Sequence, residues 1–229
     1  MPAKPPPRVT SRAPASPNVR RPVQLAIGAS GLAMLALVLG WIALSGGGEG
    51  GVDPQESEGA RVALEQAGCT LNVAPAQGSE PGHLDVPTPD TRVEWNTFPP
   101  TSGPHYAKPV VWGAYDEPLE QTRVVHNLEH GGISIQYGEL VPEQTVAALR
   151  DFYDDHQNGT LLAPLPELGL SIALAAWVAP AQGEAGAKPG QGYLATCTSF
   201  DEPAFAAFLD AFQFKGPERF PEIALAPGT

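Results

Sequence analysis

Apolar residues follow several distinct patterns along this chain of 229 residues, and each pattern predicts a different kind of structure. The longest is an uncharged apolar run over residues 23–44. A membrane-spanning helix needs about 20 such residues, so this run predicts one transmembrane helix. The run is also longer than the apolar core of an ordinary signal peptide. Cleavage of a signal near Ala43 to Ser45 remains the alternative, because the residues there are small.

Three later segments have the features of helices. Residues 60–67 predict a short helix, and residues 141–156 predict a longer one, with apolar positions at helical spacing after Pro142. Asp201 is a typical capping residue for a final helix that ends before Gly216. That helix carries one apolar stripe, made of Phe205, Phe208, Leu209 and Phe212.

Two segments predict strands. Residues 133–137 alternate between apolar and polar types, and residues 171–178 form an apolar run of strand length. Strands and helices that follow one another in this way predict an α+β or α/β fold with a small sheet and two to three helices. We therefore expect a single compact domain over residues 60–229.

The segments outside this domain have the composition of unfolded chain. Residues 1–22 are rich in Pro, Ala and Arg and predict a disordered tail, and residues 45–59 begin with a glycine-rich tether. Within the domain, the glycine-rich segment 181–192 predicts a surface loop.

The charges predict which side of a membrane each part occupies. Five basic residues and no acidic residue precede the end of the apolar run at Leu44, which predicts a cytoplasmic N-terminus and an exterior C-terminal domain, as in a single-pass anchor in the cell membrane. The rest of the chain holds 8 basic and 25 acidic residues, a net charge of about −17. Such a surface repels nucleic acid, so we expect no nucleic-acid partner. The sequence does not indicate a protein partner.

Both cysteines, Cys69 and Cys197, lie in the part expected outside the cytoplasm, where disulfides persist. We expect them to form one disulfide. A pair of thiolate metal ligands is the alternative, but the chain contains no C-x-x-C pair that would favour it.

The candidate chemistry centres on His126-Asn127-Leu128-Glu129-His130. In a helix, His126 and His130 project from one face, which is how a short helix presents a divalent metal ion. Gly131-Gly132 follows directly, so any helix here is at most about two turns and ends in a left-handed glycine cap. These glycines also allow the backbone to pass close to the loop 99–105.

The same letters match the H-x-x-E-H signature of inverzincin metalloproteases, which predicts a zinc hydrolase with Glu129 as general base. Such enzymes place the motif in a longer helix and need a further acidic ligand, for which this chain shows no distinctive candidate. In a third interpretation the histidines are structural, and the domain is an interaction module without metal. Its partner surface would be lined by Trp95, Tyr106, Trp112 and Tyr115.

A further histidine, His105, lies in a loop over residues 95–106 that three prolines stiffen. Imidazole suits several transition metals. No methionine occurs after Met34, so the sequence favours Cu(II) or Zn(II) over a thioether site for Cu(I). The fifth histidine, His156, lies near the end of a predicted helix and has no assigned function.

Two runs in this sequence, Pro99 to His105 and Val125 to Gly132, closely resemble the domain-of-unknown-function 3105 family of bacterial exported or anchored proteins. The resemblance covers roughly residues 65–220 and extends to His83, to Ala176-Trp177 and to a terminal Gly-Pro-Glu at 216–218. It implies that Glu129 and four histidines, His83, His105, His126 and His130, belong to one pattern, although the family has no agreed activity.

The leading hypothesis is therefore a membrane-anchored domain that binds one copper or zinc ion for metal binding, delivery or sensing. Its predicted ligands are His83, His105, His126 and His130. Glu129 is the predicted orienting partner, accepting the other N–H of a ligand imidazole.

Overall fold

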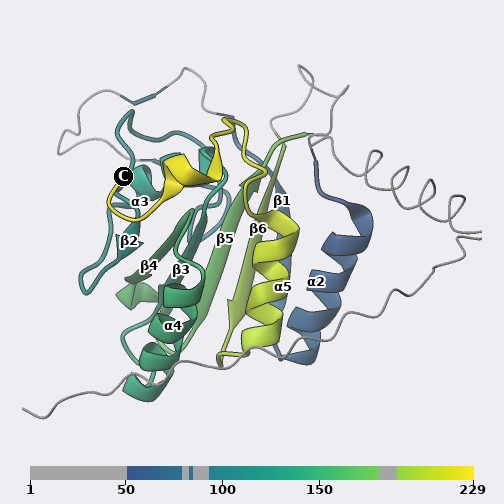
Figure 1. Cartoon of the computed structure of the whole chain (residues 1–229), viewed down its shortest axis with the longest axis vertical. Coiled ribbons are helices and arrows are strands. Elements are labelled where there is room, and N and C mark those ends of the chain that lie inside the picture. The colour runs from purple at the N-terminus through teal and green to yellow at the C-terminus, as the bar shows by residue number, and fades with distance from the viewer. Residues whose placement is uncertain (1–50, 79–82, 85–92, 181–189) are drawn as a thin grey trace, which may run out of the picture. The chain divides into compact units, whose positions relative to one another are not determined.

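A mixed sheet of six strands is the centre of the computed structural model, which describes residues 51–78, 83–84, 93–180 and 190–229. The strands are β1 (Thr70–Pro75), β2 (Gly113–Ala114), β3 (Ile133–Tyr137), β4 (Thr160–Pro164), β5 (Ile172–Val178) and β6 (Gln191–Cys197). Their order in the sheet is β1-β6-β5-β3-β4-β2 (Figure 1). The pairs β3-β4 and β4-β2 are parallel, and the other three pairs are antiparallel.

The described residues contain four α-helices, more than the two to three predicted, and two short 3₁₀ helices. They are α2 (Pro54–Gln66), α3 (Gln121–Glu129), α4 (Glu143–Asp155), α5 (Glu202–Phe212), η1 (Pro166–Leu168) and η2 (Glu222–Leu225). All described residues belong to one compact unit, and the fold is α+β.

The side chains of β5 alternate between two apolar clusters, one on each face of the sheet. Leu174 and Ala176 face the cluster that α2, α4 and α5 cover (Figure 1). Ala175 and Trp177 face the opposite cluster, to which α3 contributes Val125 and Leu128. The sheet is therefore covered on both faces, with α3 opposite the other three helices.

The predicted helix over 141–156 is confirmed as α4, and the final helix is confirmed as α5. Asp201 caps α5, since its carboxylate accepts a 3.0 Å hydrogen bond from the Ala204 backbone N–H. The side chains of Phe205, Phe208 and Phe212 are fully buried. Burial of each such ring stabilises the fold by about 1.5–3 kcal/mol.

The helix predicted over residues 60–67 is present as α2 but begins earlier, at Pro54, within the range expected as linker, 45–59. The Asp53 carboxylate accepts hydrogen bonds from the backbone N–H groups of Gln55 and Glu56. An aspartate cap followed by proline in the first turn is a strong helix start, and this signal outweighs the polar composition of the segment.

The predicted strands are confirmed as β3 and β5, but the loop predicted over 181–192 is wrong at its end. Gln191 and Gly192 belong to β6, whereas residues 181–189 lie outside the described residues. A Cβ atom on Gly192 would lie only 2.0 Å from the Thr101 hydroxyl oxygen. Glycine at this position therefore leaves room for the loop that carries Thr101 to pack against the strand.

The predicted disulfide between Cys69 and Cys197 is confirmed. Cys69 follows α2 and Cys197 ends β6, where Thr70 and Thr196 pair at the end of the β1-β6 ladder. Both cysteines are buried in the cluster beneath α2 and α5, on the opposite face of the sheet from α3.

The predicted tail 1–22 and transmembrane segment 23–44 lie outside the described residues, as does the first part of the linker. Among the residues that the structure does describe, no helix is both long and apolar enough to span a membrane.

Candidate metal centre

Helix α3 carries the central motif and is short, as predicted. It has nine residues, about two and a half turns, and His130 is its C-terminal capping position. Gly131 follows with φ of +87°, which confirms the expected left-handed glycine cap. Val125 and Leu128 hold the helix on the sheet, and His126 and Glu129 lie on its side toward the proline-rich loop.

Asn127 fixes the position of α3 against the preceding loop. Its side chain is fully buried and makes two 2.8 Å hydrogen bonds to Val110, one from the Val110 N–H and one to the Val110 carbonyl. A hydrogen bond from the Tyr106 N–H to the Thr122 carbonyl ties the same loop to the first turn of the helix. These hydrogen bonds between the loop and α3 bring His105 and Tyr106 close to the helix.

The loop before His105 is held in shape by its own polar side chains. The Thr97 hydroxyl accepts a 3.1 Å hydrogen bond from the Thr101 N–H, and the Ser102 hydroxyl accepts one of 2.9 Å from the Gln77 N–H. Gly103 has φ of +117°, which side chains rarely adopt, so glycine is needed at this turn.

His83 reaches the same place through one short bridge. The Leu84 N–H donates a 2.8 Å hydrogen bond to the His105 carbonyl, and Leu84 pairs with Tyr106 as an isolated parallel bridge. The His83 ring stacks on the His126 ring, with centroids 4.9 Å apart and an interplanar angle of 11°. His83 is the exposed member of the site, since 41% of its side chain is accessible.

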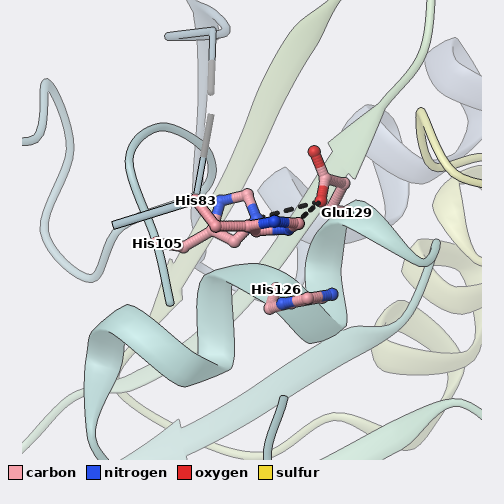
Figure 2. Close-up of side chains that lie close together, drawn as sticks. All are labelled: His83, His105, His126 and Glu129. Atoms are coloured by element: carbon pink, nitrogen blue, oxygen red, sulfur yellow. Dashed lines mark ion pairs between the residues drawn. The ribbon is translucent and has the colours of Figure 1, made fainter. Parts of the chain in front are cut away.

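One potential ligand atom from each of four residues falls within 4.8 Å of the others: His83, His105, His126 and Glu129. We call these residues the inner group. Figure 2 shows the His83 and His105 rings meeting the Glu129 carboxylate, with His126 beside them on α3. His105 is fully buried, and only 4% of His126 and 6% of Glu129 are exposed. Four donors from three separate segments therefore converge at a largely buried point.

Backbone carbonyls set the tautomers of two of the imidazoles. Nδ1 of His105 lies 2.8 Å from the Gly103 carbonyl oxygen, and Nδ1 of His126 lies 2.7 Å from the Tyr106 carbonyl oxygen. A carbonyl oxygen only accepts hydrogen bonds, so both Nδ1 atoms carry the proton and donate it. When the rings are neutral, both Nε2 atoms present a lone pair, which is the form that binds a metal ion.

His105 and Glu129 form a close contact of opposite charges. Nε2 of His105 lies 2.9 Å from Oε2 of Glu129. Burial opposes a charged His105, but the Glu129 carboxylate and the Gly103 carbonyl outweigh it and raise the His105 pKa. Burial also acts against a charged Glu129, while contact with His105 and the nearby imidazoles lowers its pKa. The His105 imidazole and the Glu129 carboxylate therefore form a buried pair of opposite charges when His105 is protonated.

The two histidines of the α3 motif, His126 and His130, favour the neutral state. Burial lowers the His126 pKa, even though the Tyr106 carbonyl raises it. Burial and the neighbouring His126 lower the pKa of His130 to about 4. A neutral imidazole binds a metal ion without first losing a proton.

His130 lies in a second group of potential ligands, with His126 and Glu218. Its Nε2 atom is 3.0 Å from Nε2 of His126 and 3.4 Å from Oε2 of Glu218. We call His126, His130 and Glu218 the outer group. The Phe220 ring lies against His130, with centroids 4.3 Å apart.

Comparison with known families decides the relationship of the chain. The family model described as protein of unknown function (DUF3105) matches residues 87–223, more than half of the chain. The protein belongs to the DUF3105 family. The chain has no significant match among curated proteins and none among solved structures. His105, Glu129 and Glu218 fall within the matched range, whereas His83 lies just before it.

The DUF3105 domain brings the five predicted site residues into one region but divides them differently from the prediction. Glu129 lies among the potential ligands of the inner group, and His130 lies in the outer group. The orienting role expected of Glu129 is taken at His105 and His126 by the backbone carbonyls of Gly103 and Tyr106.

Gly131 and Gly132 were expected to lie close to the loop 99–105. They are closely approached, but by other residues. A Cβ atom on Gly132 would lie 2.1 Å from the Trp112 ring, and one on Gly131 would lie 2.9 Å from the Gly216 nitrogen. The glycines of this DUF3105 domain therefore accommodate Trp112 and the segment 214–218.

Sequence reasoning missed two residues of the site. Asn127 lies within the central motif, and only its two bonds to Val110 reveal its anchoring role. Glu218 belongs to the terminal Gly-Pro-Glu, which supported the resemblance to DUF3105 but gave no sign of its contact with His130. His156, to which no function was assigned, is outside both groups among the described residues.

Replacing Gly216 by alanine is expected to destabilise this DUF3105 domain. The added Cβ would lie 2.3 Å from the Glu129 carbonyl oxygen and from the Gly131 nitrogen, both of them backbone atoms. We expect a loss of about 1–3 kcal/mol in the free energy of unfolding, measured by urea denaturation. Gly59→Ala in α2 is the control, because its Cβ would meet nothing within 4 Å. Equal stability of the two variants would contradict the packing described.

Proposed function

We propose that the protein binds one divalent transition-metal ion through the inner group. The observation that carries the proposal is the convergence of three imidazoles and one carboxylate at a largely buried point. Nε2 of His105 and Oε2 of Glu129 lie 2.9 Å apart, a separation that two ligands of one cation can also adopt.

The donor set favours Zn(II) or Cu(II) as the ion. Three imidazole nitrogens and one carboxylate oxygen suit a four-coordinate zinc ion, and imidazole suits Cu(II) as well. Both cysteines are committed to the disulfide, and neither group contains a sulfur donor. Ions that prefer thiolate or thioether ligands are therefore poor candidates.

The proposed setting is the exterior side of a cell membrane, to which the uncharged run 23–44 would anchor the domain. A disulfide buried in the core supports an oxidising compartment. The strongly acidic composition of the chain after that run supports a domain that attracts cations rather than nucleic acid. There the protein would capture, deliver or sense the ion.

Two alternatives receive less support from the geometry. A hydrolase of the H-x-x-E-H type needs Glu129 free of the metal to act on a water molecule, but its Oε2 lies among the inner-group donors. An interaction module built on exposed aromatics is weakened because Tyr106 and Trp112 are buried. Metal binding without hydrolysis is accordingly the function that we propose.

The test is titration of the purified full-length protein with Zn(II) and Cu(II) in competition with a chelator. We expect one ion per chain in the wild type, and Glu129→Gln should weaken its binding by more than about 10–100-fold, the range for loss of a residue that only orients a ligand. His156→Gln is the matched control. A Glu129→Gln protein that binds the ion normally but loses hydrolysis of model peptides would instead indicate a general base. Absence of binding in the wild type would refute the proposal.

A further inference from the structure

The outer group has the separations expected of ligands that share one ion. Metal bonds of about 2.0–2.2 Å allow two ligand atoms of one ion to lie up to about 4.4 Å apart. Nε2 of His126 and Nε2 of His130 are 3.0 Å apart, and Nε2 of His130 is 3.4 Å from Oε2 of Glu218. Two imidazoles four residues apart on a helix, with one carboxylate, form a reasonable partial coordination shell for a divalent ion.

Both groups depend on the same atom. Nδ1 of His126 donates its proton to the buried Tyr106 carbonyl, so only Nε2 is available to a metal. A ring nitrogen has one lone pair in the ring plane and therefore binds one ion. Two ions cannot occupy the inner and outer groups together through His126. The groups are alternative positions for a single ion.

The carboxylate of the outer group is far more exposed than that of the inner group. Of the Glu218 side chain 50% is accessible, compared with 8% of the Glu129 side chain, although the inner-group His83 is also 41% accessible. Glu218 is thus the carboxylate that an ion from solvent meets first on this side, and His126 lies deepest in the outer group. The acidic composition of the chain favours the approach of cations to such a carboxylate.

A backbone hydrogen bond joins Glu218 to Glu129. The Glu218 N–H donates a 2.9 Å hydrogen bond to the Glu129 carbonyl, and the Phe214 N–H donates one of 2.7 Å to the Gly131 carbonyl. These bonds hold the C-terminal segment against the end of α3. Glu218 is therefore placed beside His130 by the same residues that end the helix.

We propose that His126, His130 and Glu218 form an outer site that first captures the ion and passes it to the inner group. This inference rests on metal binding by the inner group. During transfer the ion keeps its bond to Nε2 of His126. It would exchange the His130 nitrogen and the Glu218 oxygen for the nitrogens of His83 and His105 and the Glu129 oxygen. No electron is transferred, the charge of the ion is unchanged, and any proton on His105 leaves to solvent.

The rate of Zn(II) loading tests this transfer in the full-length protein. Stopped-flow mixing with a chromophoric zinc chelator would follow both loading and release. Glu218→Gln removes the outer carboxylate at a half-exposed position and should slow loading by about tenfold or more, because a carboxylate that attracts a cation raises its association rate. Glu222→Gln is the matched control, because it removes a charge from the same C-terminal segment outside both groups.

The outcomes separate the two proposals. Slower loading in Glu218→Gln, with one ion per chain at saturation in the wild type, would support the transfer. Loading at the wild-type rate in both Glu218→Gln and His130→Ala would overturn it and leave the inner site intact. Two ions per wild-type chain would overturn the shared use of His126. No ion bound in the wild type would refute the proposed function as well.

Discussion

Replacing His126 by alanine is expected to reduce Zn(II) affinity more than any other single change in this protein. His126 is the one residue that belongs to both groups of potential ligands. Its loss removes the nitrogen that both groups share. Neither the inner nor the outer group then keeps its full set of ligands. We expect affinity to fall by more than about 100-fold, beyond the effect of losing an orienting partner alone. Competition titration with a zinc chelator measures this change.

Two comparisons make the His126 result specific. His156→Ala removes a histidine outside both groups and should leave affinity unchanged. His130→Ala affects only the outer group and should weaken equilibrium binding less than His126→Ala. Circular dichroism of the metal-free variants checks that each remains folded. Equal affinities for His126→Ala and the wild type would show that the ion binds elsewhere.

Loss of the disulfide is expected to have the largest effect on stability. The Cys69–Cys197 bond joins residues 128 positions apart. The chain-entropy account puts the contribution of such a cross-link at roughly 4–5 kcal/mol. A Cys69→Ser, Cys197→Ser double variant should lose about this much free energy of unfolding in urea denaturation.

The disulfide lies on the face of the sheet opposite α3, so its loss should act on stability and not on the site. The double variant, examined while folded, is expected to bind Zn(II) with the wild-type affinity. Wild-type protein reduced with dithiothreitol is the control and should show the same loss of stability. A folded double variant that no longer binds zinc would contradict the separation of the two faces.

The elements that sequence could predict are those whose pattern is local. The phenylalanine stripe and Asp201 cap of α5 and the continuous apolar run of β5 each occur within a single segment. Strands β1 and β6 were missed because their signals depend on pairing: β1 is largely exposed, and β6 begins with Gln191-Gly192, which resembles a loop. Only the close contact of Gly192 with Thr101 explains glycine in that strand.

The site was predictable as a set of residues but not as an arrangement. Helical spacing places Glu129 and His130 at i+3 and i+4 from His126, and both positions adjoin His126 on the helix. Which of them faces His105 depends on how α3 lies against the loop, and that is set by Asn127 and Val110. The partner of His130, Glu218, lies 88 positions further along the chain, where no local pattern could connect them.

A transition-metal ion held by the inner group would be directly visible in a crystal. The most direct measurement is anomalous X-ray diffraction from crystals of the zinc-loaded protein, recorded on both sides of the zinc absorption edge. We expect one strong anomalous peak at about 2.0–2.2 Å from nitrogen atoms of His105 and His126 and from the Glu129 carboxylate, the usual zinc bond lengths. A zinc peak only outside the inner group, or none in protein saturated with zinc, would contradict binding by the inner group.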